Sequence, residues 1–255
     1  MTEHIYIIPF NTALIDRLKG KALVVNADIN DDPLDILRIV ERQNKLHCII
    51  LNVGTLSELS FKKEWLDIPF YINSTGIGSF YEFSKRISLL KKGNIRIYID
   101  SSIPTSYTDI RILSSLGIST GIIISDKTDW DSLNDLMVYS IYTEAAHATV
   151  EPFEYIARNY SPEKIINYNR VYLDSHERYL FLDEDMKVYL NSDDYMNGKS
   201  ILADIDNVIS SSEYESKTRK LDNFFLENDT CVYCSSWKIC AGKYTDIKSE
   251  SGCQK

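Results

Sequence analysis

Short β-branched runs alternate with helical patterns through residues 1–160, and this alternation constrains the fold more than any other feature of the sequence. Strands that are separated by helices run parallel and are joined by right-handed crossovers. Strands are predicted at residues 5–8, 22–26, 48–53, 70–72, 95–99 and 121–124. Six strands are too few to close an eight-stranded barrel. We therefore expect an α/β fold with an open, partial (β/α) barrel-like parallel sheet.

Helical patterns fill the connections between these strands, at residues 33–42, 80–90, 107–116 and 130–143. Asp32 and Asp129 directly precede two of them and are predicted N-caps, because a carboxylate there accepts hydrogen bonds from the first turn. The strand sequences CIILNV and TGIIIS are interpreted as apolar on both faces. Such strands are typical of a parallel sheet that helices cover on each side.

The pattern changes near residue 165, so we expect a β/α domain over residues 1–165 and a small module over residues 166–255. Residues 178–191 predict a β-hairpin with strands at 179–182 and 187–190 around the acidic turn 183–185. A helix is expected from Val208 to Glu227, and a cysteine-rich loop follows it directly. A module this small needs a bound metal to remain folded.

Four of the five cysteines crowd into the last part of the chain, with the spacing C-x2-C-x5-C-x12-C: Cys231, Cys234, Cys240 and Cys253. Four thiolates can complete the tetrahedral ligand set of a structural Zn²⁺ or of an iron–sulfur cluster, and the spacing does not decide between them. Two disulfides are the alternative. The N-terminal sequence MTEHIYIIPF lacks the features of a signal peptide. This favours a cytoplasmic protein with reduced thiols that bind a metal.

The composition narrows the classes of partner. A net charge of -9 argues against a general nucleic-acid binder, which presents a basic face. No apolar run approaches the ~20 residues that span a bilayer, so no membrane association is expected. The 17 tyrosines suit contacts with proteins or peptides.

The C-terminal segment resembles a SPASM domain. Its hairpin YLFLDEDMKVYLN, the segment LADIDNV and the run C-x2-C-x5-C-A-G are similar to the C-terminal extension of many radical SAM enzymes that modify ribosomal peptides. The preceding β/α repeats then resemble the partial barrel of a radical SAM core. That core requires C-x3-C-x2-C, whereas Cys48 is the only cysteine before Cys231 and lies in a strand pattern typical of a small buried hydrophobe. The resemblance therefore implies no functional S-adenosylmethionine site and no catalytic residue.

The same resemblance implies one retained metal centre. Asn191 and Tyr244 stand where a SPASM domain typically has cysteines of its first auxiliary cluster, and a third cysteine, expected before the hairpin, is missing. The ligands of the second cluster correspond to the complete set Cys231, Cys234, Cys240 and Cys253. We expect these four to hold one [4Fe-4S] cluster, with Zn²⁺ as the alternative.

Among such proteins, the chain resembles the stand-alone SPASM-type peptide maturases of grasp-with-spasm systems, which are encoded beside an ATP-grasp ligase and a small precursor peptide. The implied function is that of a non-catalytic accessory protein that binds the precursor peptide, the ATP-grasp ligase or both. The alternatives are a peptide-modifying enzyme that uses its single iron–sulfur cluster, and a zinc-stabilised interaction module. Peptide capture at an exposed strand edge, either residues 5–8 or the hairpin, is one expected binding mode.

Several other motifs favour structural interpretations. Gly76-Ile77-Gly78 predicts a tight β/α loop rather than a phosphate site. The acidic loop at residues 28–32 is explained by helix capping as well as by a bound cation, and residues 183–185 favour a hairpin turn over a calcium loop. His147 or Glu144 would line a remnant of a substrate cleft near the ends of the β/α repeats.

Overall fold

The computed structural model describes residues 4–125, 127–168, 171–199, 205, 208, 210–227, 231 and 233–240. The chain divides into two compact units, Met1–Glu154 and Tyr155–Lys255. The first unit is α/β with a parallel sheet, as predicted from the alternating pattern. None of the helices in the described part of the chain has both the length and the apolar character needed to cross a membrane.

Parallel strands form the sheet of the first unit, in the order β7-β6-β5-β4-β3-β2-β1. Six of them match the predicted strands within a few residues. The bounds of the seven strands are β1 (Ile5–Pro9), β2 (Ala22–Ala27), β3 (Lys45–Val53), β4 (Phe70–Ser74), β5 (Ile95–Asp100), β6 (Thr120–Ile123) and β7 (Val150–Glu151). The seventh, β7, was not predicted, because a strand of two residues carries no periodic signal.

The bounds of the helices in this part of the chain are α1 (Thr12–Arg17), α2 (Pro33–Val40), the 3₁₀ helix η1 (Lys63–Trp65), α3 (Phe80–Ser84), α4 (Ile87–Leu90), α5 (Ser106–Ser115), α6 (Trp130–Tyr142) and α7 (Phe153–Asn159). The four predicted helical segments lie between these strands, one of them divided in two, and three helices were not predicted: α1, η1 and α7. The helix predicted over residues 80–90 is in fact two helices, since α3 ends at Ser84 and α4 begins at Ile87. The short helix α1 was not predicted; Asn11 caps it by accepting hydrogen bonds from the first turn.

The two predicted N-caps are confirmed. Asp32 accepts a hydrogen bond from the backbone N–H of Leu34 at the start of α2. Asp129 accepts one from Asp131 at the start of α6. Each cap fixes where a helix begins directly after the loop that leaves a strand.

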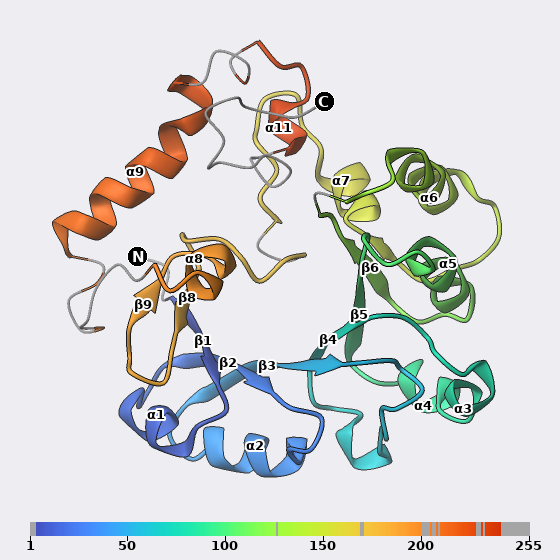
Figure 1. Ribbon diagram of the computed structural model, residues 1–255, viewed down its shortest axis with the longest axis horizontal. Coiled ribbons are helices and arrows are strands. Elements are labelled where there is room, and N and C mark those ends of the chain that lie inside the picture. The colour runs from blue at the N-terminus through green and yellow to red at the C-terminus, as the bar shows by residue number, and fades with distance from the viewer. Residues whose placement is uncertain are drawn as a thin grey trace. The chain divides into compact units, whose positions relative to one another are not determined.

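The helices α1 to α6 lie on the outer side of the curved sheet (Figure 1). Leu51 of β3 is buried on this side, where it lines a cavity together with Pro33 of α2. The next residue, Asn52, points to the opposite face because side chains alternate along a strand, and it is exposed. The helices α1 to α6 therefore lie on one side of the sheet (Figure 1), whereas helices on each side were expected. Asn52 is exposed on the inner face, although Cys48 and Tyr98 on that face are buried.

The second unit contains the predicted hairpin. Strands β8 (Tyr179–Leu182) and β9 (Val188–Tyr189) pair antiparallel. Asp183 closes the turn, because its Oδ1 accepts hydrogen bonds from the backbone N–H groups of Asp185 and Lys187. This use of the carboxylate agrees with a turn rather than a calcium loop.

Three helices are described in the rest of this unit: α8 (Ser192–Met196), α9 (Ser212–Glu227) and α11 (Trp237–Cys240). The helix predicted from Val208 begins four residues later, at Ser212. Most of the LADIDNV segment lies outside the described residues. Asn191, in place of a SPASM cysteine, caps α8 by accepting a hydrogen bond from Asp194 N.

Candidate functional site on the inner face of the sheet

Three asparagines form a hydrogen-bonded row across the inner face of the sheet. Asn26, Asn52 and Asn73 lie near the carboxyl ends of β2, β3 and β4. Nδ2 of Asn73 donates to Oδ1 of Asn52 at 2.9 Å, and Nδ2 of Asn52 donates to Oδ1 of Asn26 at 2.7 Å. We call these three residues the amide row. Substrate sites of β/α folds form at this carboxyl edge.

The amide row has donor and acceptor sites that the hydrogen bonds within the row do not use. A side-chain amide has two N–H donors and an oxygen that accepts two hydrogen bonds, and the bonds above use one donor and one acceptor site of Asn52. Asn52 is exposed, whereas Asn26 and Asn73 are half-buried. Oδ1 of Asn73 is buried and has no hydrogen-bond partner within the described residues. A polypeptide backbone offers N–H and C=O groups that match the second donor and the second acceptor site of the exposed Asn52.

The register of the parallel strands continues this row with an aromatic residue. Asn73 pairs with Tyr98 of β5, and Tyr98 pairs with Gly121 of β6. The rings of Tyr98 and Tyr71 are stacked, with centroids 4.2 Å apart and an interplanar angle of 10°. A Cβ atom on Gly121 would overlap the Tyr98 ring. Tyr98 is therefore held between a stacked ring and a glycine.

Arg96 places a positive charge on the same face. It lies two residues before Tyr98 on β5 and is exposed. Burial raises the pKa of the Tyr98 phenol to about 12, although the Arg96 charge and hydrogen bonds with Tyr71 and Arg96 act to lower it. The inner face thus combines amide groups, a neutral buried phenol and an exposed guanidinium. This combination suits the binding of a polar, extended ligand.

Cys48 also belongs to the inner face, four residues before Asn52 on β3. It is buried, with 7% of its surface exposed. Burial raises the pKa of its thiol to about 12, and the nearby Arg96 charge lowers it only in part. The predicted small buried hydrophobe is confirmed, because a thiol with this pKa stays protonated at neutral pH.

We expect Cys48 to resist alkylation in the native protein. Thiolates react and thiols do not, so iodoacetamide at about pH 8 should leave Cys48 unmodified in the folded chain and modify it fully in guanidinium chloride. Peptide mapping by mass spectrometry measures both. Equal modification of Cys48 under the two conditions would contradict its burial.

The predicted metal ligands lie in the second unit. Cys231 is buried, Cys234 and Cys240 are half-buried, and Cys253 lies outside the described residues. Cys234 N donates to Cys231 O at 3.0 Å, which closes a turn between the C-x2-C pair. Within the described ranges, no group of three or more His, Cys, Asp or Glu side chains is close enough to hold a metal ion. Four thiolates suit zinc or iron–sulfur chemically, and three of the four cysteines lie within the described residues, so the centre stays a prediction.

The described cysteines form no disulfide with one another. Two disulfides within the C-terminal set would require at least one bond among Cys231, Cys234 and Cys240. The two-disulfide alternative is therefore not present in this structure.

Helix α11, which carries Cys240, forms hydrogen bonds with residues 162–168 of the same unit. Tyr168 Oη donates to Ile239 O at 2.5 Å, and Ile166 N donates to Lys238 O at 2.9 Å. Lys238 Nζ donates to Pro162 O. These bonds fix one predicted ligand-bearing helix without a metal.

Two other motifs have the structural roles that were favoured. In the Gly76–Gly78 loop, Ile77 N donates to Asp109 Oδ2 at 3.2 Å, so a carboxylate of this chain occupies the loop that a phosphate would need. In the acidic loop, Asp31 Oδ2 accepts a hydrogen bond from Asp28 N while Asp32 caps α2.

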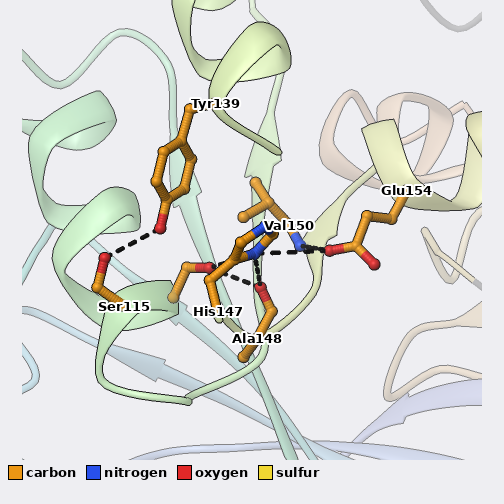
Figure 2. A network of polar contacts seen from close by, with 7 residues as sticks. Ser115, Tyr139, His147, Ala148, Val150 and Glu154 are labelled. Carbon is orange, nitrogen blue, oxygen red and sulfur yellow. Dashed lines mark hydrogen bonds and ion pairs between the residues drawn. The ribbon is translucent and has the colours of Figure 1, made fainter. Parts of the chain in front are cut away.

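His147 and Glu144 do not line the candidate site. Both precede β7 and so lie toward the amino ends of the strands. Figure 2 shows His147 among groups that fix the entry to β7: its Nδ1 is 2.8 Å from Ala148 O and 3.9 Å from Glu154 Oε1. Glu154 Oε1 also accepts a hydrogen bond from Val150 N. This network is structural, and the interpretation as a cleft remnant does not hold.

Comparisons with known proteins give no match: no family model matches the chain, and no curated protein or solved structure matches it. The sequence did carry a signal for the amide row, since VVNA, ILNV and YINS each place an asparagine near the end of consecutive apolar strands.

Proposed function

We propose that this chain is a non-catalytic accessory protein in the maturation of a ribosomally made peptide, and that it binds the precursor peptide in extended form. The amide row, of which Asn52 is exposed, carries the proposal. Amide side chains hydrogen-bond peptide N–H and C=O groups without regard to sequence. The row also lies at the carboxyl edge of the sheet, where β/α folds place their ligands.

The resemblance of the C-terminal segment to a SPASM domain supports the choice of ligand and of partner. It implies a precursor peptide and an ATP-grasp ligase encoded beside this chain. The expected metal centre at Cys231, Cys234, Cys240 and Cys253 has four protein ligands and no open coordination position. Its role in this proposal is to stabilise the C-terminal module, and its thiolates take no part in peptide chemistry.

The test uses the full chain and the small peptide encoded beside its gene, labelled with a fluorophore. Fluorescence anisotropy should report saturable binding. Asn52→Ala breaks the middle of the amide row, and the loss of one or two net hydrogen bonds should weaken binding about three- to tenfold. Asn134→Ala is the matched control, because Asn134 is exposed on α6, outside the sheet face. Its affinity should stay within about twofold of the parent value.

Two results would oppose the proposal. Equal affinities of Asn52→Ala and the parent chain would place the peptide elsewhere. A change in the mass of the peptide after incubation with this chain alone would favour the peptide-modifying enzyme instead. A pull-down with the neighbouring ATP-grasp ligase tests the second partner separately.

A further inference from the structure

Helix α6 has one side that exposes large apolar side chains. We call these residues the apolar stripe: Trp130, Val138, Ile141 and Tyr142. Their exposed fractions run from 39% for Ile141 to 74% for Tyr142. Apolar patches that stay exposed and are bordered by polar residues are typical of sites that bind another protein.

The four side chains of the apolar stripe share one side of the helix. Ile141 and Tyr142 follow Val138 by three and four residues, and Trp130 precedes Ile141 by eleven residues, which is close to three full turns. The stripe therefore runs along α6 for about 18 Å. This length matches that of a partner helix of three to four turns.

The charged side chains on this side of α6 are all acidic. Asp131 and Asp135 lie beside the apolar stripe, since they are four residues apart and Asp135 precedes Val138 by three. The helix contains no lysine or arginine, and within the described part of the chain neither carboxylate forms an ion pair. The guanidinium of Arg111, on α5, lies instead over the ring of Tyr139, 5.5 Å from its centroid. Because like charges four residues apart are unfavourable in a helix, a partner that brings cations to this side is favoured.

We propose that α6 binds an amphipathic helix of a partner protein, whose apolar side is flanked by lysine or arginine residues. The apolar residues of that helix cover the apolar stripe, and its basic residues lie at Asp131 and Asp135. Packing of helix on helix suits this surface, because the main chain of α6 is hydrogen-bonded within the helix and leaves only side chains to be recognised.

A second copy of this chain fits the apolar stripe less well. Its own α6 would bring a second pair of carboxylates, and each chain has a net charge of -9, so two copies repel each other. The stripe is also separate from the amide row, because α6 lies on the outer side of the sheet (Figure 1) and the amide row on the inner face. A partner can therefore bind α6 whether or not a precursor peptide binds the inner face.

The test uses the full chain and a fluorescent synthetic peptide of about 18 residues, which is long enough to be helical. Leucines occupy one side of this peptide and lysines the other. Fluorescence anisotropy should report saturable binding that weakens as the salt concentration rises. The indole N–H signal of Trp130, identified in ¹H–¹⁵N spectra by its loss in Trp130→Phe, should shift as the peptide binds.

Two control peptides have the same length. One carries glutamate in place of lysine, and the other has the same residues in an order that spreads the leucines around the helix. Both should bind at least about tenfold more weakly, because one loses the charge complementarity and the other loses the apolar side.

Variants of the chain test the two parts of the surface. Val138→Gln with Tyr142→Gln removes apolar area while keeping a good helix former, and should weaken binding of the lysine peptide about tenfold. Asp131→Asn with Asp135→Asn should weaken it about two- to fivefold at low salt and reduce its dependence on salt. Met196→Gln is the matched control, because Met196 is exposed on α8. Its affinity should stay within about twofold of the parent value.

Three results would overturn the proposal. Unchanged affinity in the chain with Val138→Gln and Tyr142→Gln would mean that the peptide does not use the apolar stripe. Equal binding of the glutamate peptide would remove the role of the carboxylates. Self-association of the parent chain in sedimentation velocity that the same double variant abolishes would assign the stripe to a second copy of this chain.

Discussion

Replacing Cys234 by serine is expected to release the metal and unfold the C-terminal module. The prediction rests on the four-cysteine centre, in which one lost thiolate opens the ligand set. Bound metal contributes folding free energy directly, on the order of 10 kcal/mol for a structural zinc, which is more than the few hydrogen bonds of α11 supply. The measurement is metal and sulfide content after anaerobic purification, together with the melting temperature.

Cys48→Ala is the control for this experiment, because Cys48 lies buried in β3 of the first unit. It should keep the full metal content. Bound iron and sulfide with broad visible absorbance in the parent chain would support the cluster, and zinc without colour would support the structural zinc alternative. A Cys234→Ser chain with unchanged metal content and melting temperature would show that Cys234 is not a ligand.

Replacing Gly121 by alanine is expected to destabilise the first unit by about 1–3 kcal/mol, the usual cost of overpacking. The added methyl group has no room, because the ring of Tyr98 occupies its position. Tyr98 is fully buried and stacked on Tyr71, so it cannot move away without disturbing the inner face. Urea unfolding of the parent and variant chains measures the change in free energy.

A double-mutant cycle provides the control. In a Tyr98→Leu background the ring is gone, and Gly121→Ala should cost much less than it does in the parent chain. Equal costs in the two backgrounds would mean that the clash with Tyr98 is not the cause. Because Tyr98 continues the amide row in register, Gly121→Ala should also weaken binding of the precursor peptide.

Local patterns in the sequence were sufficient for most of the fold. β-branched runs marked six strands, and Asp32 and Asp129 marked the starts of α2 and α6. Elements shorter than about two turns of helix or a few strand residues, such as α1 and β7, carry too few residues for a period to be seen. The break between α3 and α4 at Lys85 and Arg86 is likewise absent from the apolar pattern, because neither residue excludes a helix.

The candidate site was less accessible to sequence reasoning. Each asparagine of the amide row is an isolated polar residue within its own strand, and only the register of the sheet brings the three together. Asn52 pairs with Asn73, and Asn26 pairs with Ile50, two residues before Asn52. The sequence pattern does not predict a polar inner face, because one asparagine in CIILNV leaves the run apolar in character. The cysteine spacing, in contrast, is plain in the sequence. The convergence of the thiols is set by the fold of the loop that carries them, which the spacing alone does not specify.

The hydrogen bonds of the amide row all point the same way, and this gives the inner face a polarity. Each Nδ2 donates toward β2, so the row ends in a carbonyl oxygen at Asn73 and in an NH₂ group at Asn26. The side-chain dipoles therefore add rather than cancel. The oxygen of Asn73 is buried, so a strand-like guest would meet the exposed Asn52 and the NH₂ group of Asn26, with its acceptors near β2. Under the proposed function, such a row would favour one direction of a bound peptide without reading its side chains.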